Sequence, residues 1–218
     1  MNRFHAVLIV ALAFLGLTFA PSGLAKPTPD VEYKLITPPQ RAAGKGVEVL
    51  EFFNYACSHC YDFEPLLKSW LKTKPKDVEF RYVPAVFNES MLPLAKTYYT
   101  LEELGLLDRM HDRVYEAIHE KHVKLADRSV MIKWIAEQGV DATKFEGAYD
   151  SFSVDSKAKR AGQLTRAYRI TATPFVAVAG KYLTAPSLTL RADGDVDPNR
   201  FFQVLNDLVI MGRGGANK

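Results

Sequence analysis

The feature that most constrains this fold is the order in which strand patterns and helix patterns follow one another. A strand pattern, a helical pattern and a second strand pattern succeed one another within about 40 residues and make a βαβ unit. A hairpin pattern and a final helix stand near the C-terminus. The elements expected in these two groups are an edge strand at Val31–Ile36, a buried strand at Val47–Asn54, a helix from Cys57 to about Lys72, strands at Val78–Pro84, Phe175–Ala179 and Tyr182–Thr184, and a helix opening at Asp197-Pro198.

The segment between the two groups, from about residue 88 to residue 168, contains only helical patterns. Asp127 and Asp141 are typical N-caps, and Gly105 and Gly139 are typical of helix C-termini. We therefore predict one α/β domain, residues 26–87 and 169–218, with a helical domain, residues 88–168, inserted between the two halves of its sheet. The expected helices are Glu89–Leu104, Leu106–Lys121, Arg128–Gln138, Ala142–Tyr149 and Val154–Tyr168.

Residues 1–25 have the pattern of a signal peptide. Arg3 gives a basic start, Ala6 to Ala20 form an apolar run, and Gly23-Leu24-Ala25 provides the small residues of a cleavage site. An uncleaved membrane anchor is the alternative, but a spanning helix needs about 20 apolar residues and this run has about 15. We expect an exported protein whose mature chain begins at Lys26.

The charge of the chain narrows the range of partners. The 218 residues include 28 basic and 25 acidic ones, which gives a net charge of +3. Removal of residues 1–25 takes away one basic residue and no acid, so the mature chain is closer to neutral. Because acids and bases are also interspersed, the sequence indicates neither a nucleic-acid partner nor binding to an anionic membrane surface.

The only two cysteines, Cys57 and Cys60, are the residues most informative about chemistry. Disulfides persist in exported proteins, yet a bridge across two intervening residues closes too small a loop to stabilise a fold. Cys57 is expected at the N-terminus of a helix, where free N–H groups and the helix dipole favour a thiolate. His59 can add a donor or a positive charge beside the sulfur. Cys60 follows one turn later on the same side.

This spacing predicts a strong oxidant. Cβ atoms one turn apart on a helix are separated by about 5–6 Å, whereas a relaxed disulfide places them about 3.5–4.5 Å apart. A strained bridge and a stabilised thiolate both favour the reduced form. Two alternatives are an inert structural bridge and half of a zinc site. For zinc, His119 and His122 are the only further candidate ligands, and they lie on a charged stretch that is expected to face solvent.

Two more positions have open interpretations from the residues alone. On a strand buried on both faces, Glu51 would lie in a medium of low dielectric near the cysteines, where it could accept and return protons. An outward-pointing carboxylate at a strand end fits the residues equally well. Thr173-Pro174 precedes the returning strand, and since only about one X–Pro bond in twenty is cis, composition favours a trans bond in an ordinary loop.

Four segments together resemble the DsbA-type thiol:disulfide oxidoreductases of bacterial periplasms. They are Glu51-Phe52-Phe53, Cys57-Ser58-His59-Cys60-Tyr61, Thr173-Pro174-Phe175-Val176 and Gly180-Lys181-Tyr182. The resemblance covers essentially the whole mature chain and implies a thioredoxin fold with a helical insertion, in a protein of the periplasm. We expect a monomer that uses no cofactor and binds no metal.

The resemblance also implies roles for individual residues. Cys57 would be the exposed nucleophile, Cys60 its buried partner, and Glu51 the buried acid beneath the disulfide. Pro174 would be a cis-proline that faces the active site. The backbone of Thr173, just before it, would pair with an extended substrate segment.

Two positions depart from the best-known members of this family. Ser58 stands where those members carry proline, and Thr173 stands where valine is common. The residues between the two cysteines tune the stability of the thiolate, and Thr173 lies where partners would bind. The resemblance therefore implies the direction of the redox potential and leaves its exact value and the preferred partner open.

The predicted activity is thiol–disulfide exchange with unfolded, newly exported proteins. A substrate thiolate would attack Cys57, a second would resolve the mixed disulfide, and a membrane quinone-linked oxidase of the DsbB type, as the resemblance implies, would restore the bridge. Tyr61 and Phe175 would form either a shallow peptide groove or ordinary core. The alternatives are a disulfide isomerase or reductase that works from the dithiol state, and a non-enzymatic binding module with a structural bridge.

Overall fold

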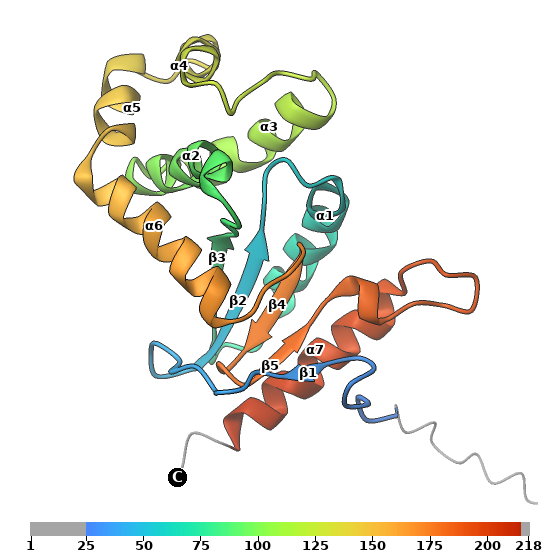
Figure 1. Ribbon diagram of the computed structural model, residues 1–218. Helices are drawn as coiled ribbons and strands as arrows, with labels where there is room; N and C mark the ends of the chain where they lie inside the picture. The colour runs from blue at the N-terminus through green and yellow to red at the C-terminus, as the bar shows by residue number, and fades with distance from the viewer. Residues whose placement is uncertain (1–24, 215–218) are drawn as a thin grey trace, which may run out of the picture.

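The computed structural model describes residues 25–214, so the expected signal peptide lies outside the described residues except for Ala25. Within this range one five-stranded sheet has the order β1-β5-β4-β2-β3 (Figure 1). β2 lies between β3, to which it is parallel, and β4, to which it is antiparallel. The strands are β1 Lys34–Leu35, β2 Val47–Phe53, β3 Val78–Pro84, β4 Phe175–Val178 and β5 Tyr182–Thr184.

Helices make up most of the remaining described chain. Five of the α-helices, α2 to α6, lie between β3 and β4 in the sequence. None of the helices within residues 25–214 has both the length and the apolar character that crossing a bilayer requires. The α-helices are α1 Ser58–Thr73, α2 Leu92–Glu103, α3 Leu107–His119, α4 Arg128–Glu137, α5 Ala142–Tyr149, α6 Phe152–Ala167 and α7 Pro198–Arg213, and the 3₁₀ turns are η1 Glu89–Met91 and η2 Pro186–Leu188.

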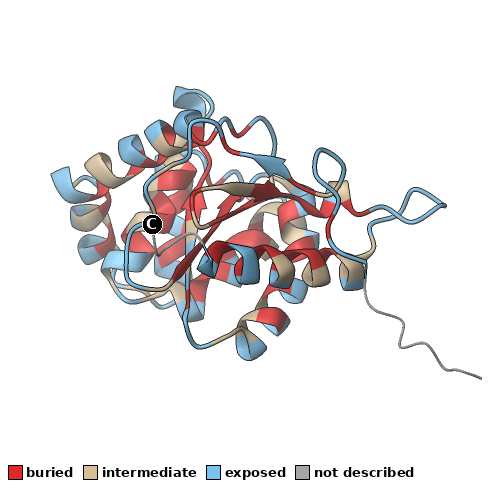
Figure 2. Cartoon of the chain, turned by 90° about the horizontal axis from the view of Figure 1, so that it is seen from below, coloured by how far each residue is buried: buried red, intermediate tan, exposed pale blue. Residues whose placement is uncertain are grey.

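Every residue of β2 is buried because helices cover both faces of the sheet (Figure 2). Side chains alternate between the two faces of a strand. Val49 packs with residues of α1 and α7 on one face, and Leu50 and Phe52 pack with residues of α6 on the other. Glu51 alternates with Leu50 and Phe52, so this acid faces the same side as α1, the helix that begins at the cysteines.

The helices α2 to α5 enclose a second core that reaches the sheet. Phe53, at the end of β2, and Tyr55, in the loop after it, are buried in that core with Met110, Val114 and Tyr115 of α3. The Phe53 and Tyr55 rings meet edge to face at 5.1 Å, and the Tyr55 and Tyr115 rings at 5.0 Å. The helical segment thereby fixes the loop that leads to Cys57.

The expected fold class is confirmed, and local signals placed several elements closely. β3, α5 and β5 have the predicted bounds. Asp127 and Asp141 cap α4 and α5 through their carboxylates, as predicted. Gly105 and Gly139 follow α2 and α4 with φ of 66° and 71°, a conformation that glycine adopts without steric cost.

Three predicted elements are shorter than expected, and one of them is the helix expected over Leu106–Lys121, which is α3, Leu107–His119. The helix expected over Glu89–Leu104 is a 3₁₀ turn followed by α2, because Pro93 has no N–H to donate to the Glu89 carbonyl. The edge strand expected over Val31–Ile36 is reduced to β1, because a turn with a 2.8 Å bond from the Asp30 N–H to the Tyr33 carbonyl precedes it.

One helix begins earlier than expected. α6 starts at Phe152, two residues before the predicted Val154, because the Ser151 hydroxyl accepts a hydrogen bond from the Val154 N–H. Serine at this position is a strong N-cap. The sequence contained this signal, and the prediction missed it.

The packing of α7 on the sheet can be tested with a matched pair of variants. Leu205 is fully buried, whereas Ile210 on the same helix is 58% exposed. Leu205→Ala is expected to lower the free energy of unfolding by about 2–5 kcal/mol through lost contacts and a cavity. Ile210→Ala is expected to change it by about 0.5 kcal/mol or less. Urea unfolding of the reduced proteins measures both, and equal losses would contradict this packing.

Candidate active site

Cys57 is the N-cap of α1, and a tight turn after β2 holds it there. Its N–H bonds to the Asn54 carbonyl at 2.9 Å, and its own carbonyl accepts from the Tyr61 N–H in the first helical turn. The Asn54 side chain accepts from the Ala56 N–H at 2.8 Å. Cys57 is half-buried and Cys60 has no exposed surface, and both are free thiols. Cys60 is buried, as expected, whereas Cys57 is half-buried rather than fully exposed.

Donors converge on the Cys57 sulfur. The hydrogen bond from the Cys60 side chain contributes most to lowering the pKa of Cys57, which falls to about 5. The Thr173 side chain and the backbone N–H groups of Cys60 and His59 act in the same direction, and partial burial opposes them. The protonated thiol also donates to the Thr173 carbonyl at 3.3 Å, a bond that ionisation removes. The balance favours the thiolate at neutral pH.

The pKa of Cys60 is shifted in the opposite direction, upward. Burial raises the pKa of the Cys60 thiol far above its usual range, and the hydrogen bond to Cys57 and the charge of Glu51 act in the same direction. Cys60 therefore keeps its proton under conditions in which Cys57 has lost its own. The pair holds one proton and one negative charge near pH 7.

Glu51 is fully buried, with 0% of its surface exposed, and neither carboxylate oxygen has a hydrogen-bond partner. Burial raises the pKa of this acid, and the charges of Glu64 and Cys57 add to the effect. Of the two interpretations open from the sequence, the buried one is correct. The carboxyl lies close enough to affect the pKa of Cys60.

A loop distant in sequence completes the site. The Thr173-Pro174 bond is cis, as the family resemblance implies and contrary to the expectation from composition. It places the Thr173 carbonyl against the Cys57 sulfur, across 116 positions of sequence. Of the residues predicted from sequence, Cys57, Cys60, Glu51, Thr173 and Pro174 thus meet at one place.

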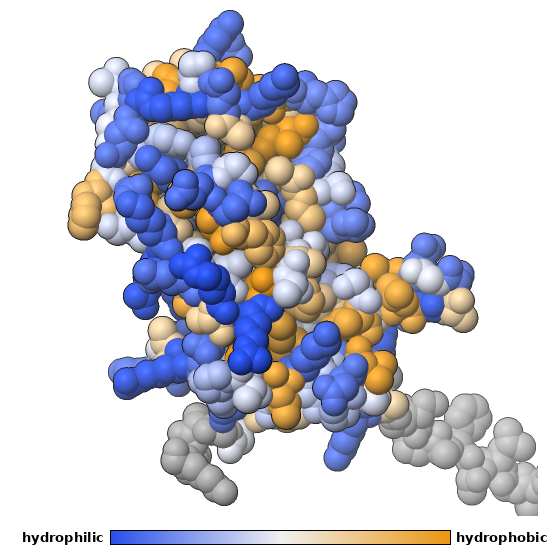
Figure 3. Space-filling view, viewed as in Figure 1, coloured by the Kyte–Doolittle hydropathy of each residue, from blue (hydrophilic) through white to orange (hydrophobic). Residues whose placement is uncertain are grey.

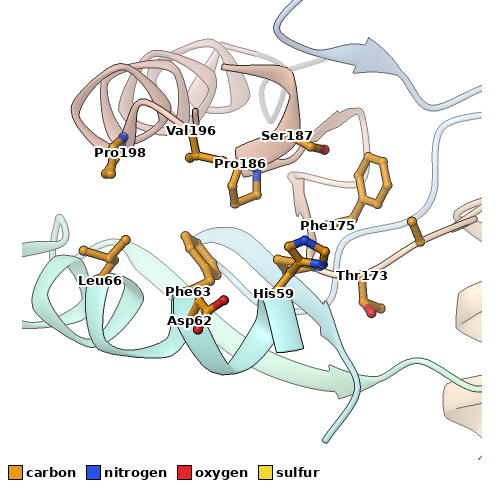
Figure 4. Close-up of a pocket in the computed structure, with 12 residues that line it drawn as sticks. His59, Asp62, Phe63, Leu66, Thr173, Phe175, Pro186, Ser187, Val196 and Pro198 are labelled. Atoms are coloured by element: carbon orange, nitrogen blue, oxygen red, sulfur yellow. The ribbon is translucent and has the colours of Figure 1, made fainter. Parts of the chain in front are cut away.

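An apolar groove of about 400 Å³ adjoins the dithiol (Figure 4). The exposed His59 lines the groove, together with Thr173 and Pro174 from the cis-proline loop. Figure 3 shows hydrophobic side chains on the loop that leads into α7 and hydrophilic ones at its tip. The other apolar lining residues are Phe63, Leu66, Ala172, Phe175, Pro186, Val196 and Pro198.

Tyr61 is absent from this groove, so only Phe175 of the two aromatic candidates lines it. The Tyr61 ring stacks on His119 at 5.1 Å and 4°, and its hydroxyl donates to Glu120. His119 Nε2 also lies 2.8 Å from the Tyr55 carbonyl. The end of α3 therefore holds the start of α1, a contact that no local sequence pattern revealed.

The expectation that both His119 and His122 face solvent was wrong for His119. His119 is half-buried between Tyr61 and the loop after β2, whereas His122 is exposed. Among residues 25–214, no three or more His, Cys, Asp and Glu side chains are grouped so that they could hold a metal ion. The zinc alternative therefore finds no support in the described part of the chain.

Thiol–disulfide exchange uses a thiolate beside a protonated thiol. One sulfur attacks or leaves as an anion, and the other remains protonated during that step. Together with a βαβ-ββα sheet and a cis-proline loop, this pair defines a thioredoxin-fold thiol:disulfide oxidoreductase. Comparison with known proteins narrows this class. The family model of the DSBA-like thioredoxin domain matches residues 48–194, and the chain belongs to that family.

Individual relatives are similar to this chain in sequence over most of their length. The thiol:disulfide interchange protein DsbA of Bordetella pertussis is 44% identical over 183 residues, 83% of this chain and 86% of that protein. The DsbA of Burkholderia cepacia is 34% identical over 212 residues, 96% of each chain. The crystal structure of Pseudomonas aeruginosa DsbA is similar with a TM-score of 0.80 at 33% identity, over 88% of this chain and 97% of that one. The protein is thus a disulfide oxidoreductase of the DsbA type.

The low pKa of Cys57 can be measured directly. Acid titration of the reduced protein, followed by the ultraviolet absorbance of the thiolate, is expected to show a midpoint near pH 5. Thr173→Val should raise this midpoint because it removes the hydroxyl that stabilises the thiolate, and Thr173→Ser should leave it in place. Cys57→Ser should remove the transition. A midpoint near the usual value of about 8.5 would contradict this description of the site.

Proposed function

We propose that this protein donates its Cys57–Cys60 disulfide to newly exported proteins in the periplasm and is reoxidised by a membrane quinone-linked oxidase of the DsbB type. The low pKa of Cys57 carries the proposal, because a stabilised thiolate favours the reduced form and so makes the oxidised form a strong oxidant. The signal peptide expected at residues 1–25 and the matching relatives support an exported protein, and we propose that it works as a monomer.

The exchange begins when a substrate thiolate attacks the half-exposed Cys57 sulfur. A bond forms between the substrate sulfur and Cys57, the Cys57–Cys60 bond breaks, and its electron pair remains on Cys60. Cys60 then takes a proton, which Glu51 can supply because its burial favours the protonated carboxyl. His59, exposed between the two cysteines, is proposed to stabilise the negative charge that develops on the sulfurs.

The second step releases the products. A second substrate thiolate attacks the substrate sulfur of the mixed disulfide, and the bond to Cys57 breaks with its electron pair on Cys57. Cys57 leaves readily because its thiolate is stable at neutral pH. The substrate leaves with its disulfide, and the enzyme holds one thiolate and one thiol.

The groove can bind substrates of many different sequences. Its lining is mostly apolar, so unfolded chains can bind through side chains that a folded protein would bury. The backbone at Thr173 is proposed to pair with an extended segment of the substrate and so to bring the substrate sulfur to Cys57. A chain that has folded no longer presents such a segment.

If the protein is a strong oxidant, reduction of its disulfide should make the folded protein more stable. The pKa of Cys57 is about 5 in the folded reduced protein and about 8.5 in an unfolded chain. The thiolate therefore stabilises the reduced fold most above the unfolded pKa, and this stabilisation is lost as the pH falls through 5. At pH 7 dithiothreitol is expected to raise the melting temperature, and the rise should disappear below pH 5.

The melting measurement distinguishes a binding module, and the redox equilibrium with glutathione distinguishes a reductase or isomerase. In a binding module with a structural bridge, reduction would lower the melting temperature at pH 7. In a reductase or isomerase, the glutathione equilibrium would lie near that of thioredoxin. The Cys57→Ser/Cys60→Ser double variant should show no response to dithiothreitol.

The cysteine roles predict distinct outcomes for single variants. Cys57→Ser should abolish oxidation of a reduced, unfolded test protein, because the attacked sulfur is gone. Cys60→Ser should also fail to oxidise it, but its Cys57 thiolate should attack a disulfide of an oxidised test protein, release one substrate thiolate and remain as a mixed disulfide, detectable on a non-reducing gel. Turnover beyond one equivalent should require membranes that contain a DsbB-type oxidase. Equal turnover with membranes that lack this oxidase would refute the proposed route of reoxidation.

A further inference from the structure

Among the described residues that line the apolar groove beside the dithiol, one is an acid, Asp62, which has no role in the mechanism given above. The other polar residues of the lining are His59, Thr173 and Ser187, and the rest of the lining is apolar. No lysine or arginine of residues 25–214 lines the groove beside the carboxylate. The groove therefore presents one negative charge on an otherwise apolar surface.

The Asp62 carboxylate is open to solvent and has no partner within the described chain. Asp62 is exposed, whereas the next residue, Phe63, is buried. Within residues 25–214 no group forms a hydrogen bond or an ion pair with this carboxylate. By contrast, Asp112, which faces the opposite side of α1, is paired with Lys68. The charge of Asp62 can therefore act on a molecule that enters the groove.

The surface next to Asp62 is apolar on both walls of the groove. Leu66 follows Asp62 by four residues, so the two lie on one face of α1, and Leu66 is 39% exposed. Val196, in the loop before α7, lines the facing wall and is 38% exposed (Figure 4). A side chain with an apolar stem and a positive end matches this surface, because the stem can pack on the two walls while the end reaches the carboxylate. Lysine and arginine are such side chains.

The position of Asp62 along α1 determines where a substrate would carry the basic residue. Asp62 follows Cys57 by five residues, which is about 7.5 Å along the axis of a helix. An extended chain advances about 3.3 Å per residue. In a segment that runs along the groove with its cysteine at Cys57, the residue beside Asp62 is therefore about two or three positions from that cysteine.

We propose that Asp62 makes the groove selective for unfolded segments that carry lysine or arginine two or three residues from the reactive cysteine. The inference rests on the disulfide exchange proposed above and names the class of substrate that the same site prefers. A basic side chain gains an ion pair with the carboxylate, and an acidic side chain in the same place is repelled. The carboxylate is exposed, so the effect on the reaction rate is moderate, about two- to fivefold for one ion pair of this kind.

The test compares short peptides that contain one cysteine and differ at one position. Lysine, glutamine or glutamate stands two or three residues before or after the cysteine, and the other side chains are uncharged. The oxidised, full mature protein is mixed with an excess of each peptide at pH 8, where an ordinary imidazole is neutral. Rapid acid quench and mass measurement follow the loss of the Cys57–Cys60 disulfide and give a rate constant for each peptide.

The variants are Asp62→Asn, which keeps the shape of the side chain, and Asp62→Lys, which reverses its charge. The ratio of the lysine to the glutamine rate constant is expected to be about two- to fivefold higher for the wild-type protein than for Asp62→Asn. Asp62→Lys should instead favour the glutamate peptide. The comparison of ratios cancels the reactivity of each peptide thiol and any change in the reactivity of Cys57. Added salt should weaken the preference of the wild-type protein, because it screens exposed charges.

Glu116→Gln is the matched control. Glu116 lies on α3 and lines a cavity of about 360 Å³ on the opposite side of α1. This variant removes one negative charge, as Asp62→Asn does, but leaves the groove intact. It should keep the wild-type ratio between the peptides.

Two results would overturn the inference. One is the same ratio in the wild-type protein and in Asp62→Asn at every position of the charged residue. The other is an equal loss of preference in Glu116→Gln, which would indicate an effect of net charge alone. Failure of the proposed function gives a different result, because the oxidised wild-type protein would then react with none of the peptides, whatever their charge.

Discussion

The arrangement of the whole site depends on the hydrogen bonds that converge on the Cys57 sulfur. The Cys60 thiol, the Thr173 side chain and the first N–H groups of α1 stabilise a negative charge there, and the pKa of Cys57 falls to about 5. Because these hydrogen bonds stabilise only the thiolate, they favour the reduced form of the protein over the form with the disulfide. The turn at Asn54, the cis-proline loop and the helical segment all serve to hold these donors in position.

The interior below the dithiol is unusual for a protein core. Glu51 and Glu64 are buried together, and both have carboxylate oxygens without partners. Unpaired buried polar groups reduce stability, so a core of this composition is disadvantageous unless it has a function. The role proposed for Glu51, exchange of a proton with the buried Cys60 thiol, would be such a function.

The helical segment is part of the site as well as an insertion in the sheet. Tyr55 is enclosed by α3, and its carbonyl bonds to His119 while its hydroxyl bonds to His111. Tyr61, one residue after Cys60, stacks on His119. The position of the dithiol therefore depends on helices that lie outside the sheet, and the apolar groove lies on the opposite side of α1.

The sequence by itself determined the order of the elements, most of their ends, and the start of a helix at Cys57. These depend on local patterns such as caps, turn residues and periodicity, which act over a few neighbours. The tertiary structure decided that Glu51 is buried, that the Thr173 carbonyl meets Cys57, and that His111 and His119 contact Tyr55. These depend on contacts between residues some 50 to 120 positions apart, and only the packing of the whole chain determines which face of each element such partners meet.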